Sequence, residues 1–448
     1  MPSWVRESTL TGSLERAGFT ADSARSRAAM VKKCSRALES ASRAWWVPGR
    51  IEVLGKHTDY AGGRSLLCAT DVGAVFLVAP RSDAQVRILD VRSDLETTFE
   101  IGPELGTTTG DWTNYPRTVA RRLSRNFGPL LGADLAFSSD LPLAAGMSSS
   151  SALIVAFSLI LIGTNDLARR DDYSENIHTL EDLAGYLATV ENGRTFGTLT
   201  GDAGVGTFGG SEDHTAILCS TPGMLKQYSF CPVRHEHSVR LPDSHCFVIA
   251  SSGVVAEKTG VALERYNRVS RLAGATTHAL SDGLGMPVEH MAAAIGAGDI
   301  ESLRVSLDKA KNEFSSEDLL DRFNQFVIES EEVIPSAISA LDQGDLATFG
   351  SEVKRSQDTG AKLLKNQVEQ TVWLADRAVA LGAVGASAFG AGFGGSVWAL
   401  LEGERIPEFL RQWQSDYVGR FPDCESSAEF LVARPGPAAF EITDARLD

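Results

Sequence analysis

The sequence predicts an α+β protein of two domains, with an active site in the cleft between them. The chain has 448 residues, which exceeds the usual size of a single domain. Its first half mixes short strand-like segments with helical ones, whereas residues 256–380 read as mainly helical. No repeat or low-complexity linker separates the two parts. We therefore expect a first domain over 1–235 and a second over 236–448 that pack closely together.

The predicted segments of the first half follow one another with short turns between them. In order, they are a helix (20–44), a strand, loop and strand (45–68), three short strands (74–80, 85–91 and 97–102), a helix (115–127) and a strand (133–142). A serine-rich loop and an apolar helix come next. The second half begins with a strand (245–253), continues through the helical region, and ends in an α/β portion.

Charge and cysteine usage exclude several classes of function. The formal charge of -16 and the pI of about 5.0 oppose attraction to phosphate backbones, so nucleic acid is not the expected partner. The six cysteines contain no CxxC pair, which argues against a zinc cage and favours a reducing cytoplasm. The longest apolar run, 152–163, falls short of the roughly 20 residues that span a bilayer. No membrane partner is expected.

The stretch "LPLAAGMSSSSALIVA" (141–156) carries the clearest chemistry. Small residues allow close approach of the backbone, and serine hydroxyls can bond phosphate oxygens. The helix that follows directs its N-terminal N–H groups at an anion. A phosphate loop is one interpretation, and a serine-rich cap on a buried helix is the other.

Five ordered segments together resemble a known family. "PGRIEVLGKHTDYAGG" resembles the galactokinase signature, "PLAAGMSSSSA" is similar to the phosphate loop of GHMP kinases, and "GAGFGGS" is similar to their C-terminal glycine motif. "DWTNYPRTVARRL" and "VALERYNRVSRLA" resemble two further galactokinase segments. The resemblance, which runs from about 45 to 400, implies a two-domain GHMP-kinase-like fold and an ATP-dependent sugar 1-kinase that uses Mg²⁺.

The resemblance implies a nucleotide and metal site. The expected phosphate ligands are Gly146, Ser148, Ser149 and Ser150. Ser150 would also reach Mg²⁺, together with Glu191, for which a solvated position on a helix is the alternative. Trp112 would flank the adenine, unless it is simply a core aromatic residue.

The family's catalytic base corresponds here to Asp213 in "GGSEDHTAIL". We favour Asp213 over Glu212 because the Ala-Ile-Leu segment after it, expected as a strand, keeps the family's register. Arg50 would hold this carboxylate ionised and offset charge in the transition state. The stretch "TFGTLTGDAGVG" (195–206) is expected to be an insertion beside the active site.

The sugar ligands implied by the resemblance are Asp59, His57 and, from the second half, Tyr266. Lys56 replaces a Glu that is usual in galactokinases. Because an ammonium donates and prefers an anionic partner, Lys56 either faces a C6 carboxylate of the substrate or pairs with a local acid. In the C-terminal motif, Ser387 replaces a family residue and a usual Arg is absent.

Three functions are compatible with these motifs. The first is phosphorylation of the anomeric hydroxyl of galactose or a related sugar, including a uronic acid such as galacturonate. The second is a catalytically weak galactokinase-like sensor that binds sugar and ATP and acts through a protein partner. Kinase action on a non-sugar metabolite shares the fold but does not need "HTDY" or "WTNY". The oligomeric state is left open.

Overall fold

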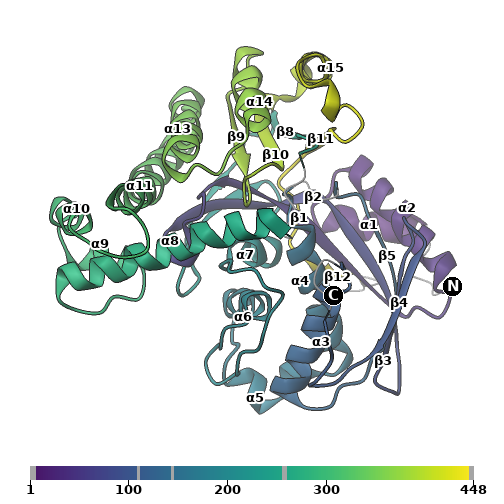
Figure 1. Ribbon diagram of the computed structural model, residues 1–448. Coiled ribbons are helices and arrows are strands. Elements are labelled where there is room, and N and C mark those ends of the chain that lie inside the picture. The colour runs from purple at the N-terminus through teal and green to yellow at the C-terminus, as the bar shows by residue number, and fades with distance from the viewer. Residues whose placement is uncertain (1–6, 108–110, 143–145, 255–259, 443–448) are drawn as a thin grey trace.

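The computed structural model describes residues 7–107, 111–142, 146–254 and 260–442, and these form a mixed α/β structure with two domains (Figure 1). The predicted α+β class is therefore confirmed. Residues 143–145 of the serine loop and 256–259 of the expected helical region lie outside the described residues, as do the outer ends of the two expected domains.

The first domain is built on an eight-stranded sheet. Six strands follow the order β12-β1-β2-β5-β3-β4, and β6 and β7 extend from β2. All pairings are antiparallel except that of β3 with β5. The strands are β1 (Arg43–Leu54), β2 (Arg64–Pro80), β3 (Gln85–Asp90), β4 (Leu95–Glu100), β5 (Ala133–Ser139), β6 (Met224–Ser229), β7 (Arg234–Arg240) and β12 (Phe440–Glu441).

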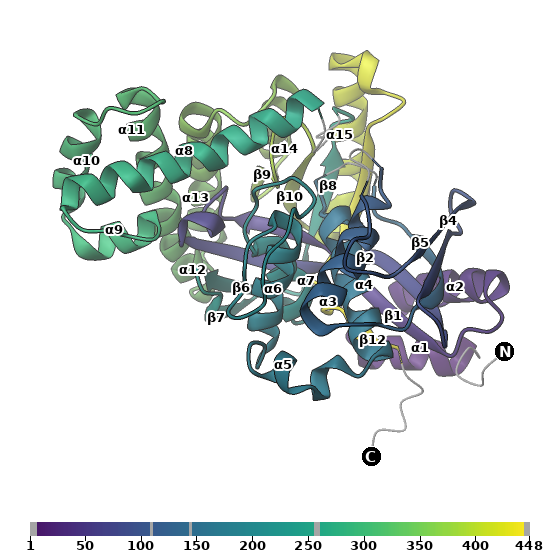
Figure 2. The same ribbon diagram turned by 60° about the horizontal axis from the view of Figure 1, so that its bottom comes forward.

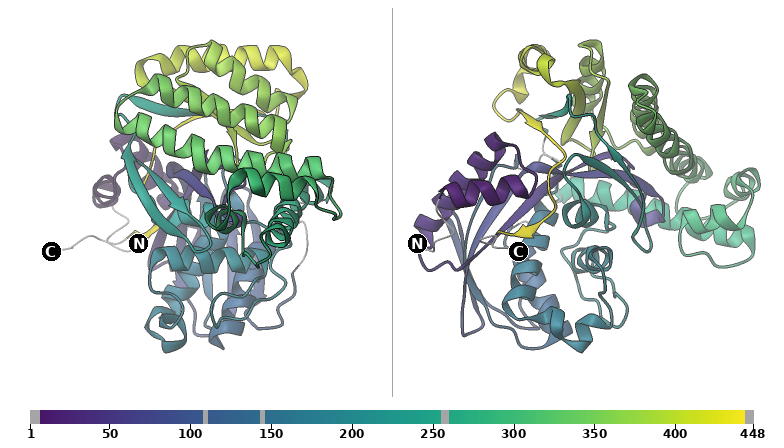
Figure 3. Two further views of the ribbon diagram at one scale, coloured as in Figure 1. Left: turned by 90° about the vertical axis from the view of Figure 1, so that its left-hand side faces the viewer. Right: turned by 180° about the vertical axis from the view of Figure 1, so that it is seen from behind.

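Successive side chains of β1 point to opposite faces of this sheet, and both faces are covered by a hydrophobic core. Trp46 packs with helices α1 (Glu7–Arg16) and α2 (Ala21–Ala37), while Trp45 belongs to the core on the opposite face. Figures 1 and 3 show α1 and α2 against the outer face. The other helices of the first domain are α3 (Asn114–Phe127), α4 (Ser149–Thr164), α5 (Asp171–Ser174), α6 (Leu180–Asn192) and α7 (Glu212–Cys219).

The second domain contains a smaller, antiparallel sheet in the order β11-β8-β10-β9. Its strands are β8 (His245–Ser251), β9 (Gly385–Phe389), β10 (Ser396–Glu402) and β11 (Glu429–Ala433). Helices α14 (Glu369–Ala380) and α15 (Ile406–Arg420) pack on one face of this sheet through a core that includes Trp413 and Tyr417.

Helices separate the strands of the smaller sheet in the sequence. The long α8 (Gly260–Leu284) packs against three shorter helices at one side of the molecule, distant from α1 and α2 (Figure 2). The three shorter helices are α9 (Met291–Ala297), α10 (Ile300–Asp308) and α11 (Ser316–Phe326). Two more helices follow, α12 (Ile334–Asp342) and α13 (Leu346–Thr359). Short helical segments are η2 (Asp59–Ala61), η3 (Leu167–Arg169), η4 (Val327–Val333), η5 (Gly360–Leu364), η6 (Gly403–Arg405) and η7 (Pro422–Cys424).

The two domains share one hydrophobic core. A single cluster joins residues of the large sheet to Phe247 and Trp398 of the smaller sheet. The chain passes from one sheet to the other between β7 and β8, a few residues beyond 235, and β12 returns to the first domain to pair with β1. In the described part of the chain, no helix is long and apolar enough to cross a membrane.

Three segments differ from the sequence-based expectation. The helix expected over 20–44 ends at Ala37, because "RAWW" already belongs to β1. The strands expected within 45–68 and at 74–80 are joined in the long β2. The Ala-Ile-Leu segment after Asp213 lies in helix α7, not in a strand, because a three-residue apolar run fits the buried side of a helix equally well.

Candidate active site

A cavity of about 570 Å³ lies where both domains contribute residues. Most of its lining comes from the first domain, whereas Tyr266, Gly390 and Ala391 belong to the second. Its apolar lining is Ala74, Phe76, Leu95, Trp112, Tyr115, Phe137, Leu141, Ala152 and Leu153. Part of its polar lining, which we call the polar group, is Arg50, Glu52, His57, Asp59, Tyr60, Glu191, Glu212, Asp213, His214 and Tyr266, and Asp90, Arg92 and Asp111 are further charged lining residues.

The serine loop lies at this cavity and at the start of α4. Gly146, Ser148, Ser149 and Ser150 all line it. Ser148 caps α4 in a left-handed conformation (φ 58°), and its buried hydroxyl has no hydrogen-bond partner among the described residues. The loop therefore presents an unsatisfied hydroxyl and a helix N-terminus to the cavity, which is the geometry of an anion site.

Buried Arg50 and half-buried Asp213 form an ion pair in the cavity. Arg50 Nε donates to Asp213 Oδ1 at 2.6 Å, and its Nη1 donates to the Gly146 carbonyl at 2.5 Å. Burial disfavours the charged guanidinium, but the carboxylates of Asp213, Glu212 and Glu52 outweigh it, so the pKa of Arg50 lies above its ordinary value. Arg50 thus joins the expected base to the serine loop.

Ser151 connects the two acidic residues predicted for catalysis and metal binding. Its hydroxyl lies 3.2 Å from Glu191 Oε2 and 3.2 Å from Asp213 Oδ2. Sequence reasoning assigned no role to Ser151. Its position after the predicted phosphate ligands was the one available signal of a role.

The described residues fit a magnesium ion held partly by phosphate. Among them, no cluster of three or more His, Cys, Asp or Glu side chains could form a metal cage. Mg²⁺ does not need one, because it binds through one or two carboxylates, substrate phosphates and waters. Glu191 and Asp213 approach a common hydroxyl beside the serine loop, which supplies hard oxygen donors of this kind.

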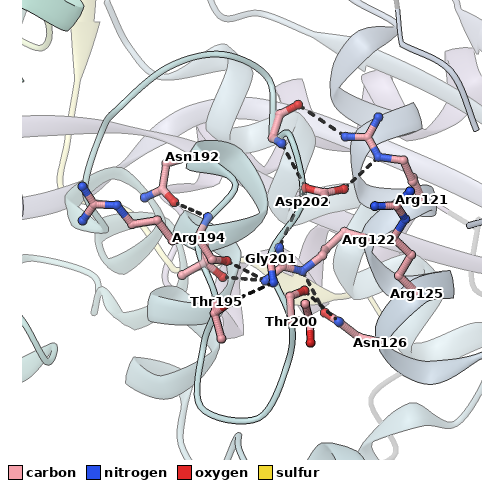
Figure 4. A network of polar contacts seen from close by, with 12 residues as sticks. Arg121, Arg122, Arg125, Asn126, Asn192, Arg194, Thr195, Thr200, Gly201 and Asp202 are labelled. Atoms are coloured by element: carbon pink, nitrogen blue, oxygen red, sulfur yellow. Dashed lines mark hydrogen bonds and ion pairs between the residues drawn. The ribbon is translucent and has the colours of Figure 1, made fainter. Parts of the chain in front are cut away.

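The stretch between α6 and α7 is anchored from α3 (Figure 4). Arg121 Nε donates to the fully buried Asp202 carboxylate at 2.7 Å, and Arg122 donates to the Arg194 carbonyl at 2.8 Å. Farther along, Thr207 donates to Glu191 Oε1 at 3.3 Å. The segment expected as an insertion is thus fixed to the first domain and supports a candidate metal ligand.

Asp59 lies in the polar group, close to the base. Its Oδ2 accepts the Glu212 backbone N–H at 3.2 Å, and burial raises its pKa. A Cβ at Gly210 would lie 2.4 Å from this oxygen, so the close approach requires glycine. The structure therefore brings the predicted sugar ligand Asp59 and the loop before Asp213 together.

His57 and Tyr266 also line the cavity, and their rings lie 5.8 Å apart. His57 Nε2 donates to the Ala391 carbonyl at 3.0 Å, so in neutral His57 the other ring nitrogen accepts from the Tyr60 hydroxyl at 2.8 Å. Both ring nitrogens are thus engaged by the protein. His57 ties the signature segment to the C-terminal glycine motif, in addition to its predicted place beside the sugar.

Lys56 does not take the place expected for a carboxylate ligand. It is not among the described residues that line the cavity. Its buried ammonium donates to Ser356 at 2.9 Å and to Ser387 at 2.7 Å, both in the second domain. These hydroxyls lie in the domain interface, where Glu329 Oε1 accepts from the Ser356 hydroxyl and from the Lys56 backbone N–H. Of the two interpretations from the sequence, these contacts favour partners within the protein, while a substrate carboxylate at Lys56 stays a prediction.

Two glutamates of the cavity were not anticipated as substrate ligands. Glu52 is buried on β1, and its Oε2 accepts the Gly390 N–H at 3.1 Å. Glu212 is buried at the start of α7, and its Oε2 accepts from Ser65 at 3.0 Å. Burial raises the pKa of Glu52 to about 7 and that of Glu212 well above its usual range. Sequence reasoning had weighed Glu212 only as an alternative base.

Trp112 is half-buried and lines the apolar part of the cavity. Its ring centroid lies 5.9 Å from that of Phe137, another lining residue. Trp112 is therefore both a neighbour of the core and a wall of the cavity, so the two interpretations from the sequence do not exclude each other.

Comparison with protein families gives three matches along the chain. Residues 36–80 match the galactokinase galactose-binding signature, 114–210 match the GHMP kinases N-terminal domain, and 337–419 match the GHMP kinases C-terminal domain. A galactokinase of Roseiflexus sp. is 30% identical over 407 residues, covering 89% of this chain and 92% of that protein. A galactokinase of Chloroflexus aggregans is 29% identical over 379 residues, covering 83% and 87%.

Solved structures share the fold. Lactococcus lactis galactokinase complexed with galactose has a TM-score of 0.74 at 20% identity, covering 93% of this chain and 99% of the other. Methanococcus jannaschii mevalonate kinase has a TM-score of 0.52 at 14% identity, covering 88% and 98%. The expected resemblance is confirmed by the family matches, and the expected two-domain architecture by the structural likeness.

Proposed function

This chain belongs to the galactokinase family of GHMP kinases and is a sugar kinase, and from that premise we propose that it transfers the γ-phosphate of ATP to the anomeric hydroxyl of galactose. The observation that carries the proposal is the Arg50–Asp213 pair, which lies in the cavity beside the serine loop. It joins a carboxylate base to a fixed positive charge where phosphate and sugar would meet.

In the proposed step, Asp213 acts as the base and Arg50 supplies positive charge. The anomeric hydroxyl gives its proton to the Asp213 carboxylate while its oxygen forms a bond to the γ-phosphorus. The bond from that phosphorus to the β–γ bridging oxygen breaks, and ADP leaves. Arg50 keeps Asp213 ionised until then and offsets negative charge on the transferring group.

The proposed phosphate ligands are Gly146, Ser148, Ser149 and Ser150. Trp112 and its apolar neighbours form the proposed pocket for the adenine ring of ATP. Ser150 and Glu191 would hold Mg²⁺, which neutralises phosphate charge when bound. Thr207 and Ser151 orient Glu191 through its two carboxylate oxygens. A metal site of this kind follows from the donor chemistry of the residues.

Charge supports a neutral sugar over a uronate. Seven carboxyl groups line the cavity, against two guanidinium groups, those of Arg50 and Arg92; the carboxyl groups are those of Glu52, Asp59, Asp90, Asp111, Glu191, Glu212 and Asp213. With Lys56 engaged in the domain interface, a substrate carboxylate would enter an acidic site with no free ammonium to receive it. The relatives named galactokinase support galactose in particular.

The experiment is ADP release from MgATP with galactose, glucose, arabinose, N-acetylgalactosamine, galacturonate and glucuronate. We expect the highest kcat/KM with galactose and no turnover of the uronates above background. Preferred turnover of a uronate would refute the substrate assignment. Binding of both galactose and ATP without ADP release would refute the kinase assignment and leave the sensor.

A further inference from the structure

Two carboxylate oxygens in the cavity lack the partners that buried acceptors require. Glu52 is 3% exposed and Glu212 is 6% exposed, and both line the cavity. Each uses one oxygen, Glu52 toward the Gly390 N–H and Glu212 toward the Ser65 hydroxyl. In the described part of the chain, the remaining Oε1 of each has no hydrogen-bond partner. Buried acceptors are normally satisfied, so this pair is suited to a donor that enters with a ligand.

The two glutamates come from elements that fix them in place. Glu52 lies within β1 and pairs in register with Leu67, while Glu212 begins α7 and directs its backbone N–H at Asp59. Their charges affect each other, because Glu52 contributes to raising the pKa of Glu212. Rigid, mutually close acceptors of this kind recognise hydroxyl groups with defined geometry and repel a further carboxylate.

The neighbouring cations do not supply partners for these two oxygens. Arg50 donates hydrogen bonds to Asp213 and to the Gly146 carbonyl. Lys56, the other nearby cation, donates to Ser356 and Ser387. Neither cation is directed at Glu52 Oε1 or Glu212 Oε1.

We infer that Glu52 and Glu212 are specificity-determining ligands that accept hydrogen bonds from ring hydroxyls of the sugar and reject uronic acids. The inference rests on the proposed sugar-kinase function, and it adds two residues to the predicted ligands Asp59 and His57. Asp213 receives the anomeric proton, whereas Glu52 and Glu212 hold hydroxyls that do not react.

The test combines Glu52→Gln and Glu212→Gln with galactose and its 2-, 3-, 4- and 6-deoxy analogues. A glutamine keeps the size of the side chain but removes its charge and replaces one acceptor with an amide donor. For each variant, kcat/KM with galactose should fall about tenfold or more, as for a lost hydrogen bond to a buried group. The fall should shrink to less than about twofold with the one deoxy sugar that lacks the recognised hydroxyl.

Glu329→Gln is the matched control. Glu329 is also buried and acidic and lies beside Lys56, but it is not among the described residues that line the cavity. It should lower kcat/KM, if at all, by the same factor for every sugar. Thermal unfolding of each variant establishes that it is folded, and calorimetry with sugar alone should show the same pattern of coupling.

Equal losses across the whole deoxy series in Glu52→Gln and Glu212→Gln would overturn the inference, as would an identical pattern in Glu329→Gln. If a Gln variant does not fold, Glu52→Asp and Glu212→Asp, which keep the charge and shift the oxygen, serve in its place. If the wild type phosphorylates galactose but neither Gln substitution loses its effect with any deoxy sugar, this inference alone is refuted. Absence of any turnover in the wild type refutes the proposed function, while the calorimetric series still tests the two glutamates.

Discussion

At the residue scale, the proposed proton transfer depends on the Asp213 carboxylate. It lies in the cavity, is bonded to Arg50 at 2.6 Å and lies 3.2 Å from the Ser151 hydroxyl. Asp213→Asn keeps the shape and removes the base, so kcat should fall by at least about 100-fold. Galactose binding measured by calorimetry should persist. A variant that keeps most of its activity would show that positioning alone suffices or that Glu212 is the base.

A second residue-scale prediction concerns stability and pH at Glu52. Burial raises the pKa of Glu52 to about 7 from an ordinary value of 4.5, against the opposing effect of Lys56 and Arg50. Between these pH values the folded protein holds a proton that the unfolded chain has released. The contribution of Glu52 to the free energy of unfolding is therefore fully present at and below about pH 4.5, and it decreases as the pH rises toward 7.

Glu52→Gln should remove this decrease. The two pKa values differ by about 2.5, which at about 1.4 kcal/mol per pH unit corresponds to at most about 3.5 kcal/mol. Urea unfolding without sugar, at pH 5, 6, 7 and 8, measures the effect. The free energy of unfolding of the variant minus that of the wild type should increase as the pH rises. Parallel curves would contradict the prediction.

Residue types and motif spacing predicted which residues would meet, but not where each side chain points. Asp213, Arg50, Asp59 and Tyr266 all line one cavity, as the motifs implied. Lys56 lies in the domain interface because Ser356 and Ser387 accept its hydrogen bonds there. Both partners are 300 or more residues away in the sequence. A local motif contains no information about such distant partners, and the same reason hid the role of Glu52 beside Gly390.

At the scale of elements, the segment between α6 and α7 is held by a buried ion pair. The Asp202 side chain is fully buried between Arg121 and Arg122 of α3. Asp202→Ala should lower the free energy of unfolding by about 3–5 kcal/mol, because it leaves buried guanidinium groups unpaired. Since this segment also carries Thr207, which contacts Glu191, kcat/KM should fall about tenfold or more.

The control for Asp202 is Glu104→Ala. Glu104 pairs with Arg125 of the same helix, but its side chain is 86% exposed. An exposed pair contributes little, so urea unfolding should change by less than about 1 kcal/mol and turnover should not change. Equal effects of the two substitutions would show that the segment between α6 and α7 is not anchored by Asp202.

The element boundaries that sequence reasoning missed are those with weak local signals. The strand β2 runs unbroken through Gly73, where the sequence had suggested two strands, because β1 pairs with it on both sides of this glycine. On its other edge, β6 pairs with residues 64–67 and β5 with residues 74–80. The Ala-Ile-Leu run of α7 has no period of its own and takes its conformation from packing in the first-domain core. By contrast, helix α3 and strands β3 and β5 were predicted to within a few residues, since their patterns are periodic.

At the scale of the whole molecule, Lys56 helps to join the two domains. Its ammonium reaches from the signature segment of the first domain to α13 and β9 of the second. Lys56→Met should lower the free energy of unfolding by on the order of 3 kcal/mol, because the nearby Glu329 and Glu52 lose a buried compensating charge. Preference for galactose over galacturonate should not reverse.

Lys365→Met is the matched control. Lys365 pairs with Asp321 at 2.8 Å, but its side chain is 55% exposed. Its replacement should change the free energy of unfolding by less than about 1 kcal/mol. A gain of galacturonate turnover on loss of Lys56, or equal stability effects of the two substitutions, would contradict the interface role.

The central claim is that this chain phosphorylates galactose at its anomeric oxygen with Asp213 as the base. The most direct measurement is ³¹P NMR of galactose and MgATP with the wild type and with Asp213→Asn. The account predicts ADP and a new phosphomonoester whose phosphorus couples to the anomeric proton, formed by the wild type and not by the variant. A phosphate on another hydroxyl, an equal product yield from the variant, or intact ATP with both ligands bound would contradict it.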